Sequence, residues 1–386
     1  MKISHFTVST VFAGLVFTQS LSGAESSSVA AALQPFVDGH SLAGAVALVA
    51  SKDKVLSVET VGFADIAANK AMTADALFWI ASQSKPMTAT ALMMVVDEGK
   101  VNVDDPVEKY LPEFKGQMVI AEQDENHALL KKPVHPITVK NVLSHTSGLR
   151  FASPMEQPTL DGLPLRDAVR SHALLPLQWE PDSKYQYSNA GINTAARIIE
   201  VVSGMAYEDF MQKRLFDPLG MKDTTFWPNE AQLHRLAKSY KPNADKSGLE
   251  ETTIGQLTYP LTDRKRQPMP AGGLFSTAQD VARFCQMILN GGTLDGRRCL
   301  SEAAVKQMTI KQTGDAVKEG YGLGWSVNGA QFGHGGAMAT NMNIDPERGL
   351  ITVWMVQHAG FPGEGGKSRD VFQHAAEARF GDAVTR

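Results

Sequence analysis

Strand-like runs of apolar residues cluster near the two ends of the chain. In the N-terminal part, two such runs are joined by a tight turn at Lys52-Asp53. Near the C-terminus there are three more, and the turn sequence 345–349 separates the last two. Because short hairpin connections join antiparallel strands, these runs predict one antiparallel sheet of about five strands. The predicted strands are 43–50, 54–61, 321–328, 339–345 and 350–357.

Helix-like spacing of apolar residues fills the middle of the chain. An apolar run from Ala89 to Val96 follows Ser82 and ends at Gly99. Capping residues and apolar spacing predict three more helices. The first begins after Thr138, the second runs from its N-cap Asn189 to Gly204, and the third runs from Thr277 to Gly291.

The two patterns together predict an α/β (α+β) fold, in which helices flank an antiparallel sheet. The sheet domain is predicted to combine residues 25–81 with residues 295–386. A mostly helical domain, residues 82–294, is inserted between these two segments. Ligand sites commonly lie between domains, so we expect the active site in the cleft between them.

The first 24 residues have the features of a secretory signal peptide. Lys2 supplies the positive start, the stretch from Phe6 to Leu21 has no charge, and Ser22 and Ala24 place small residues before a cleavage site. We therefore expect cleavage after Ala24 and a periplasmic or secreted protein, with an N-terminal membrane anchor as the alternative. No other stretch is long and apolar enough to span a bilayer, so no stable membrane insertion is expected after cleavage.

Charge and cysteine content limit the classes of partner and cofactor that we expect. The 386 residues carry a formal net charge of -4 and no run rich in Lys or Arg, so nucleic acid is not an expected partner. Cys285 and Cys299 fit buried small hydrophobic residues better than a disulfide, although export permits one. Neither cysteine lies in a cluster of ligand residues, so no metal site is expected, and no cofactor is expected either.

Ser82 and Lys85 form a Ser-x-x-Lys tetrad at the start of a predicted helix. Pro86 is tolerated only in the first turn of a helix, so this helix must begin near Ser82. Lys85 then projects from the same face, where its amine can take the proton of the Ser82 hydroxyl. That role requires a pKa about three units below the ordinary lysine value, which burial in a cleft supplies. A second tetrad, from Ser51 to Lys54, falls on the predicted hairpin turn and is interpreted as polar surface.

Tyr187-Ser188-Asn189 lies in a loop just before the helix that ends at Gly204. A phenol near Lys85 can share its proton as an acid or a base, and the Asn189 amide can bind a substrate carbonyl. As an isolated triplet, however, a helix cap and a core aromatic residue explain it better.

Gly333-His334-Gly335-Gly336 is the third element, and it lies between strand-like stretches near the C-terminus. Glycines allow a substrate to approach the backbone closely. An edge strand at this place would direct one backbone N–H to the oxyanion of an acyl-transfer intermediate, with a second N–H from Ser82. A glycine-rich bulge with a structural histidine is the alternative.

In chain order, these three motifs resemble those of the penicilloyl-serine hydrolases. The greatest similarity is to the class C β-lactamase-like group, which includes D-alanyl-D-alanine carboxypeptidases and family VIII carboxylesterases. The resemblance spans about residues 28–380, with matching flanks at 81–89, 143–149, 187–191 and 321–325. It implies a β-lactamase/transpeptidase-like fold, with Ser82 as nucleophile and Lys85 and Tyr187 as the proton-transfer pair. It further implies substrate binding by Asn189, His334, Gly335 and Gly336, and an oxyanion hole made by the backbone N–H groups of Ser82 and Ala337.

The third motif departs from the pattern of class C β-lactamases. Those enzymes carry Lys-Thr-Gly there, and the cation helps to bind the β-lactam carboxylate, whereas this chain has His334-Gly335-Gly336. A histidine with an ordinary pKa of about 6.5 is mostly neutral at pH 7. The difference favours a carboxylesterase that acts on small-molecule esters through an acyl-enzyme. A D-alanyl-D-alanine carboxypeptidase or β-lactamase, acting on amide or β-lactam substrates, and a non-catalytic peptidoglycan- or peptide-binding relative stay open as alternatives.

Two further signals are given structural interpretations. His145, in the segment His-Thr-Ser-Gly, is expected to order a loop rather than to catalyse. The glycine-rich segment 361–368 fails as a phosphate loop because Phe361 stands where the first glycine is required.

Overall fold

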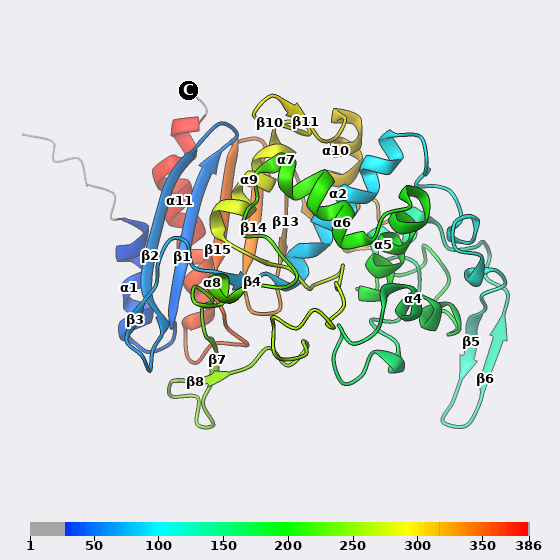
Figure 1. Ribbon diagram of the computed structural model, residues 1–386, viewed down its shortest axis with the longest axis horizontal. Coiled ribbons are helices and arrows are strands. Elements are labelled where there is room, and N and C mark those ends of the chain that lie inside the picture. Colours follow the sequence, from blue (N-terminus) through cyan, green and yellow to red (C-terminus); the bar gives the residue numbers. More distant parts are fainter. Residues whose placement is uncertain (1–27, 316, 385–386) are drawn as a thin grey trace, which may run out of the picture.

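The computed structural model describes residues 28–315 and 317–384 of the chain. A large antiparallel sheet lies between helices that pack on both of its faces (Figure 1). This arrangement confirms the predicted α/β (α+β) fold. The predicted signal peptide, residues 1–24, lies outside the described residues, so cleavage and export stay predictions. In the described part of the chain, no helix is long and apolar enough to cross a membrane.

The sheet has seven strands in the order β12-β13-β14-β15-β1-β2-β3, and neighbouring strands are antiparallel. Its centre joins the two ends of the chain, because Val46 of β1 lies opposite Met355 of β15. The strands of this sheet are β1 (Gly44–Ser51), β2 (Val55–Asp65), β3 (Lys70–Ala71), β12 (Ser326–Asn328), β13 (Gln331–Gly335), β14 (Asn341–Asp345) and β15 (Leu350–Met355).

The sheet differs from the prediction near the third motif. Of the predicted strand 321–328, only Ser326–Asn328 is a strand, and residues 322–325 form a loop. Gln331–Gly335 is a strand that was absent from the five predicted strands, because two glycines in five residues give it little β-propensity. β12 pairs with β13 only as far as Gly333, so within the described residues no strand pairs with the outer side of His334 and Gly335, where the sequence suggested an edge strand.

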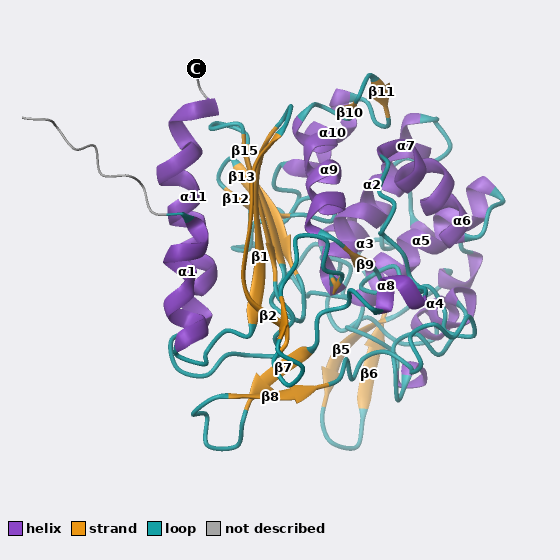
Figure 2. Ribbon diagram, turned by 60° about the vertical axis from the view of Figure 1, so that its left-hand side comes forward, coloured by secondary structure: helices purple, strands orange, loops and turns teal. Residues whose placement is uncertain are grey.

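Two hydrophobic cores lie on the two faces of the sheet, and β1 contributes to both. Val46 and Leu48 belong to the larger core, whereas Ala47 and Val49 belong to the smaller one. This alternation follows from the opposite directions of successive side chains in a strand. α1 and α11 cover the face with the smaller core, and α9 and the other helices lie on the opposite side (Figure 2).

The helices fill the region where helical spacing was predicted. α2 (Ser84–Asp97) begins next to Ser82, as Pro86 indicated, and it is buried on all sides from Ser84 to Val95. The other helices are α1 (Val29–Asp38), α3 (Val139–Ser144), α4 (Leu165–Ala173), α5 (Asn189–Ser203), α6 (Tyr207–Met211), α7 (Asp217–Leu219), α8 (Glu230–Leu233), α9 (Ala278–Leu289), α10 (Glu302–Thr309) and α11 (Ser368–Val384).

Short two-stranded sheets lie outside the seven-stranded sheet. The hairpin of β5 and β6 extends from the helical side of the molecule (Figure 1). β4 pairs with β9 directly before the turn that carries Ser82. These strands are β4 (Phe78–Trp79), β5 (Val119–Gln123), β6 (Ala128–Lys131), β7 (Ser239–Pro242), β8 (Leu249–Thr252), β9 (Phe275–Ser276), β10 (Thr293–Leu294) and β11 (Arg297–Arg298).

Most of the predicted helix caps are present. The Thr138 hydroxyl accepts from the Asn141 N–H, and the Thr277 hydroxyl accepts from the Asp280 N–H. Gly204 ends α5 in the left-handed conformation. Asn189 is not the N-cap of α5, because the residue before it, Ser188, has the extended backbone of a cap and accepts from the Gly191 N–H.

The two cysteines and the second tetrad meet their expected structural roles in part. Cys285 and Cys299 are free thiols, and Cys285 is fully buried on α9, but Cys299 is only partly buried. In the second tetrad, Lys54 is exposed on the turn before β2, whereas Ser51 is buried at the end of β1. α9 lies within the segment predicted as the inserted domain and packs against β1 and β15. The division into residues 25–81, 82–294 and 295–386 stays a prediction.

Candidate active site

Ser82 lies on a short turn that connects β4 to α2. Residues Ala81–Gln83 form one turn of 3-10 helix, which continues into α2. Ala81 has a φ of 46°, an uncommon conformation for a residue other than glycine, and strain of this kind is concentrated at functional sites. The Ser84 hydroxyl donates to the Ala81 carbonyl at 2.6 Å and so fixes the turn. Ser82 is partly exposed there, while its neighbours are buried.

The Lys85 amine is buried against three oxygen atoms. Its Nζ lies 3.1 Å from Ser82 Oγ, 2.8 Å from Asn189 Oδ1 and 2.7 Å from the Ala271 carbonyl oxygen. Burial holds the pKa of Lys85 well below its usual range. A neutral amine has two hydrogens and one lone pair. As an ammonium, Lys85 donates to all three oxygens. In the neutral form its two N–H groups can donate to the amide and carbonyl oxygens, which only accept, and the lone pair is then available to the Ser82 hydroxyl.

Tyr187 approaches both of these groups. The Lys85 Nζ lies 4.5 Å from the centre of its ring, and its phenol is near the Ser82 side chain. Burial raises the pKa of Tyr187 to about 12, although the nearby Ser82 hydroxyl acts in the opposite direction. The phenol therefore keeps its proton at neutral pH and can donate it. The structure thus brings Ser82 and Lys85 of the first motif together with Tyr187 of the second.

Asn189 takes part in the site through Lys85. Its Oδ1 accepts from the Lys85 amine at the start of α5. Among the described residues, no hydrogen bond engages its Nδ2 amino group, which leaves two donors for a substrate carbonyl.

The ring of His334 is buried, and both of its nitrogens are engaged. Nδ1 lies 2.8 Å from the Gly335 carbonyl, which can only accept, so Nδ1 carries the proton. Nε2, 2.9 Å from the Tyr321 phenol, is then the acceptor of the phenol proton. Burial lowers the pKa of His334 to about 3. The imidazole is therefore neutral and presents no cation.

The glycines of the third motif bring its strand close to the nucleophile turn. A Cβ on Gly336 would lie 2.5 Å from the Ile80 carbonyl oxygen, so only glycine allows this approach. The Gly336 N–H donates to the Thr340 carbonyl and is thus occupied. Ala337 follows on the exposed side, and in the described part of the chain its N–H has no backbone acceptor. This N–H and that of Ser82 are the donors predicted for the oxyanion hole.

For three residues, the sequence did not predict a place in the site. The Ala271 carbonyl binds Lys85 from a loop with no motif, since any residue offers a carbonyl. Tyr321 binds His334 but had been placed in a predicted strand. Phe151 is half exposed, and its ring stacks on Tyr187 with the ring centres 6.3 Å apart. An exposed aromatic side chain in a loop gives no signal that would separate it from ordinary surface.

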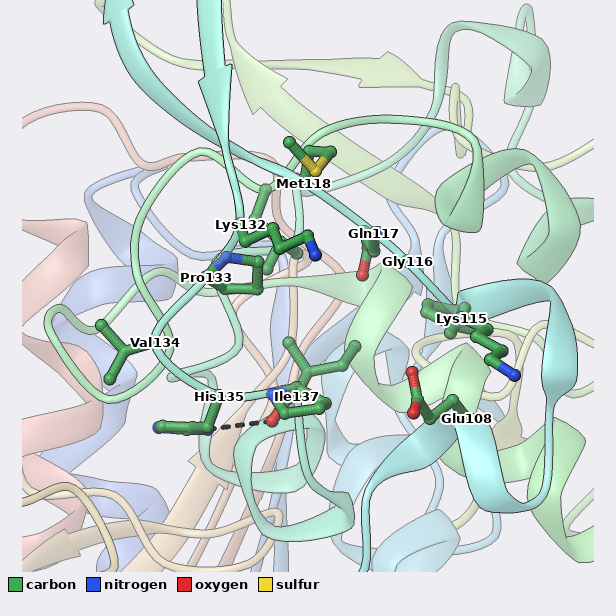
Figure 3. Close-up of a pocket in the computed structure, with 13 residues that line it drawn as sticks. Glu108, Lys115, Gly116, Gln117, Met118, Lys132, Pro133, Val134, His135 and Ile137 are labelled. Carbon is green, nitrogen blue, oxygen red and sulfur yellow. Dashed lines mark hydrogen bonds between the residues drawn. The ribbon is translucent and has the colours of Figure 1, made fainter.

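A separate cavity of about 360 Å³ lies where the β5–β6 hairpin joins the helical side (Figure 3). Phe114, Ile137 and Leu177 contribute apolar side chains, and Lys115 and Lys132 contribute cations. None of the predicted site residues lines it. Within the described residues, no group of three His, Cys, Asp or Glu side chains is arranged to hold a metal ion.

An antiparallel sheet flanked by helices, with Ser82, Lys85 and Tyr187 in contact, defines a serine hydrolase of the β-lactamase type. The chain belongs to the Beta-lactamase family, whose model matches residues 29–376.

Named relatives include both esterases and penicillin-binding proteins. Penicillin-binding protein 4 of Amycolatopsis lactamdurans is 30% identical over 73% of this chain and 72% of its own length. Esterase EstB of Burkholderia gladioli is 30% identical over 64% of this chain and 66% of its own length. Among solved structures, EstCE1, described as a hydrolase with promiscuous acyltransferase activity, matches with a TM-score of 0.76 and 24% identity. That match covers 90% of this chain and 97% of EstCE1, and it supports the fold.

Proposed function

We propose that this protein is a carboxylesterase that acts through an acyl-enzyme on Ser82. One observation carries the choice of esters: the third motif contains no cation. His334 is neutral, and its two nitrogens are engaged by Gly335 and Tyr321. A substrate carboxylate, as in a peptide or a β-lactam, would find no positive partner there. An uncharged ester needs none.

In the proposed acylation, Lys85 is the base. The Ser82 hydroxyl gives its proton to the lone pair of the Lys85 amine while Oγ attacks the ester carbonyl. The N–H groups of Ser82 and Ala337 stabilise the oxyanion that forms. Tyr187 then donates its proton to the leaving alkoxide as the carbon–oxygen bond breaks, and the Lys85 ammonium returns a proton to the phenolate. The products are an acyl-Ser82 ester, an alcohol and a neutral Lys85.

Deacylation uses the same groups with water in place of the alcohol. The Lys85 and Tyr187 pair takes a proton from water as it attacks the acyl carbonyl, and the Ser82 oxygen leaves and regains a proton. Asn189 supports both steps by accepting from Lys85 and by offering its amino group to the substrate carbonyl.

A short-chain p-nitrophenyl ester tests the proposal with the mature protein. We expect a burst of p-nitrophenol equal to the enzyme concentration if deacylation is the slower step, and loss of turnover in Ser82→Ala. Ser51→Ala, in the second Ser-x-x-Lys tetrad, is the matched control and should keep full activity. A fluorophosphonate probe should label wild type at Ser82 and leave Ser82→Ala unlabelled. Unchanged turnover in Ser82→Ala would disprove the assignment.

The second candidate function is that of a D-alanyl-D-alanine carboxypeptidase or β-lactamase, which the similarity to penicillin-binding protein 4 favours. Stable labelling by a fluorescent penicillin, release of D-alanine from a peptide ending in D-Ala-D-Ala, or fast nitrocefin hydrolysis would support it over the esterase. A protein that resists every one of these probes would be a non-catalytic peptidoglycan- or peptide-binding relative. We also propose export, which N-terminal sequencing of the secreted or periplasmic protein tests by finding Glu25 first.

A further inference from the structure

His145 occupies a constrained position directly after α3. Its backbone is left-handed, with a φ of 61°, and its N–H donates to the Asn141 carbonyl to end the helix. Asn141 is itself fixed, because it forms a capping box with Thr138 at the other end of α3. The His145 side chain is fully buried. This histidine is therefore one of the most rigidly placed polar groups around the site.

The backbone on both sides of Tyr187 is attached to His145. The N–H of Gln186 donates to the His145 carbonyl at 2.8 Å, and the N–H of Ser188 donates to His145 Nδ1 at 3.2 Å. The imidazole also packs against the Tyr187 ring, with the ring centres 4.6 Å apart. Three contacts from one residue thus surround the residue that carries the phenol.

The hydrogen bond from Ser188 fixes the tautomer of His145. An N–H donates to Nδ1, so Nδ1 is unprotonated and the ring proton is on Nε2. The titratable groups that face the ring are Lys85 from α2, His334 from β13, and the phenols of Tyr185, Tyr187 and Tyr321. No carboxylate is among these groups, and the ring stays neutral beside Lys85.

We infer that His145 is a positioning residue: by accepting the Ser188 N–H at Nδ1, it holds the phenol of Tyr187 in its position in the site. This inference rests on the proposed acyl-transfer function and goes beyond the expectation that His145 merely orders a loop. The Nδ1 lone pair, rather than the volume of the ring, is the feature that the site needs. Its loss would leave a buried N–H without a partner and free the Tyr187 segment to shift.

Two substitutions separate the lone pair from the ring. His145→Asn places an amide oxygen near the position of Nδ1, and asparagine tolerates the left-handed backbone. His145→Phe keeps an aromatic ring and removes the acceptor. We expect His145→Phe to lower the rate of Ser82 labelling by a fluorophosphonate, and kcat for a p-nitrophenyl ester, by about 10- to 100-fold. His145→Asn should stay within about fivefold of wild type, and KM should change little in both.

The order of the two variants decides the question. A higher rate in His145→Phe than in His145→Asn would show that ring packing matters and would overturn the inference. If wild type itself resists the fluorophosphonate, the proposed function fails instead. Should either variant not fold, ¹⁵N NMR of wild type decides, with histidine labelling and assignment by elimination. We expect Nε2-protonated His145 from pH 6 to pH 8, and a protonated Nδ1 in that range would overturn the inference.

Discussion

The close approach of Gly336 to the nucleophile turn provides a sharp test of the oxyanion hole. A Cβ at this position would lie 2.5 Å from the Ile80 carbonyl oxygen and 2.2 Å from the Thr340 hydroxyl oxygen. Side-chain Cβ atoms essentially never approach other atoms within 3.0 Å. The hydroxyl can rotate away, but the carbonyl belongs to the backbone. Gly336→Ala must therefore push the strand end and the Ser82 turn apart by at least about 0.5 Å.

This displacement separates the two N–H donors of the proposed oxyanion hole. Losing one such donor lowers kcat by about 10²–10³-fold, which corresponds to about 2.7–4 kcal/mol of transition-state stabilisation. We expect Gly336→Ala to lose activity in this range when pre-steady-state release of p-nitrophenol is measured. Because the oxyanion forms only during reaction, kcat should fall far more than KM rises.

Gly335→Ala is the control, one residue away on the same strand end. A Cβ there has its nearest neighbours at 3.6 Å and 3.7 Å, which is ordinary van der Waals contact. We expect this variant to keep nearly wild-type kcat and thermal stability; because Gly335 is an expected substrate-binding residue, any change should be confined to KM. Equal activity of the two alanine variants would refute the argument, as would equal loss in both.

Three more predictions follow from buried groups. Lys85→Met should slow acylation by about 10²–10⁴-fold. Wild-type acylation should be lost as pH falls through the lowered pKa of Lys85, because only the neutral amine accepts the Ser82 proton. Stopped-flow acylation rates measured across pH test both expectations. Tyr321→Phe leaves Nε2 of buried His334 without a donor and should lower the free energy of unfolding by about 1–3 kcal/mol in urea titrations. Arg266→Met breaks the buried 2.7 Å ion pair with Asp161 and should destabilise by about 3–5 kcal/mol in the same assay.

The Lys85 and Arg266 predictions have their own controls. Lys54→Met alters the second tetrad and should leave the acylation rate unchanged. A slower acylation in that variant would show that the effect of Lys85→Met is not specific to Lys85. An acylation rate independent of pH, down to the acid limit of stability, would contradict the neutral-amine mechanism. For Arg266, the double replacement with Asp161→Leu should recover stability, since no charge is then left buried alone. A double variant as unstable as the single one would show that the loss has another cause.

Local rules allowed the sequence to locate the candidate catalytic groups, but they did not give their surroundings. Pro86 fixed the start of α2 and thereby the relation of Ser82 to Lys85, because a proline restricts the helix in a known way. The link from Lys85 to the Ala271 carbonyl spans 186 positions and uses a group that every residue has, so no pattern indicates it. The capping residue of α5 was misplaced by one position, since serine and asparagine are equally good caps.

The third motif shows a similar limit. Its glycines suggested close backbone approach, which the Ile80 contact bears out. The same glycines hid β13, because propensity depends on side chains that glycine lacks. That His334 would accept from Tyr321 could not be anticipated, since Tyr321 directly precedes a loop, residues 322–325, that the sequence predicted as part of a strand.

The pairing of β1 with β15 has a consequence for biosynthesis. Residues 46–51 find their neighbours at 350–355, so the middle of the sheet cannot close until almost the entire polypeptide has been made. Until then the first hairpin presents an open apolar edge, the kind of surface that chaperones protect and that joins other chains when left alone. Any premature stop before residue 350 would release a product whose most buried strand has lost its partner, which makes aggregation rather than partial activity the expected fate of truncated forms.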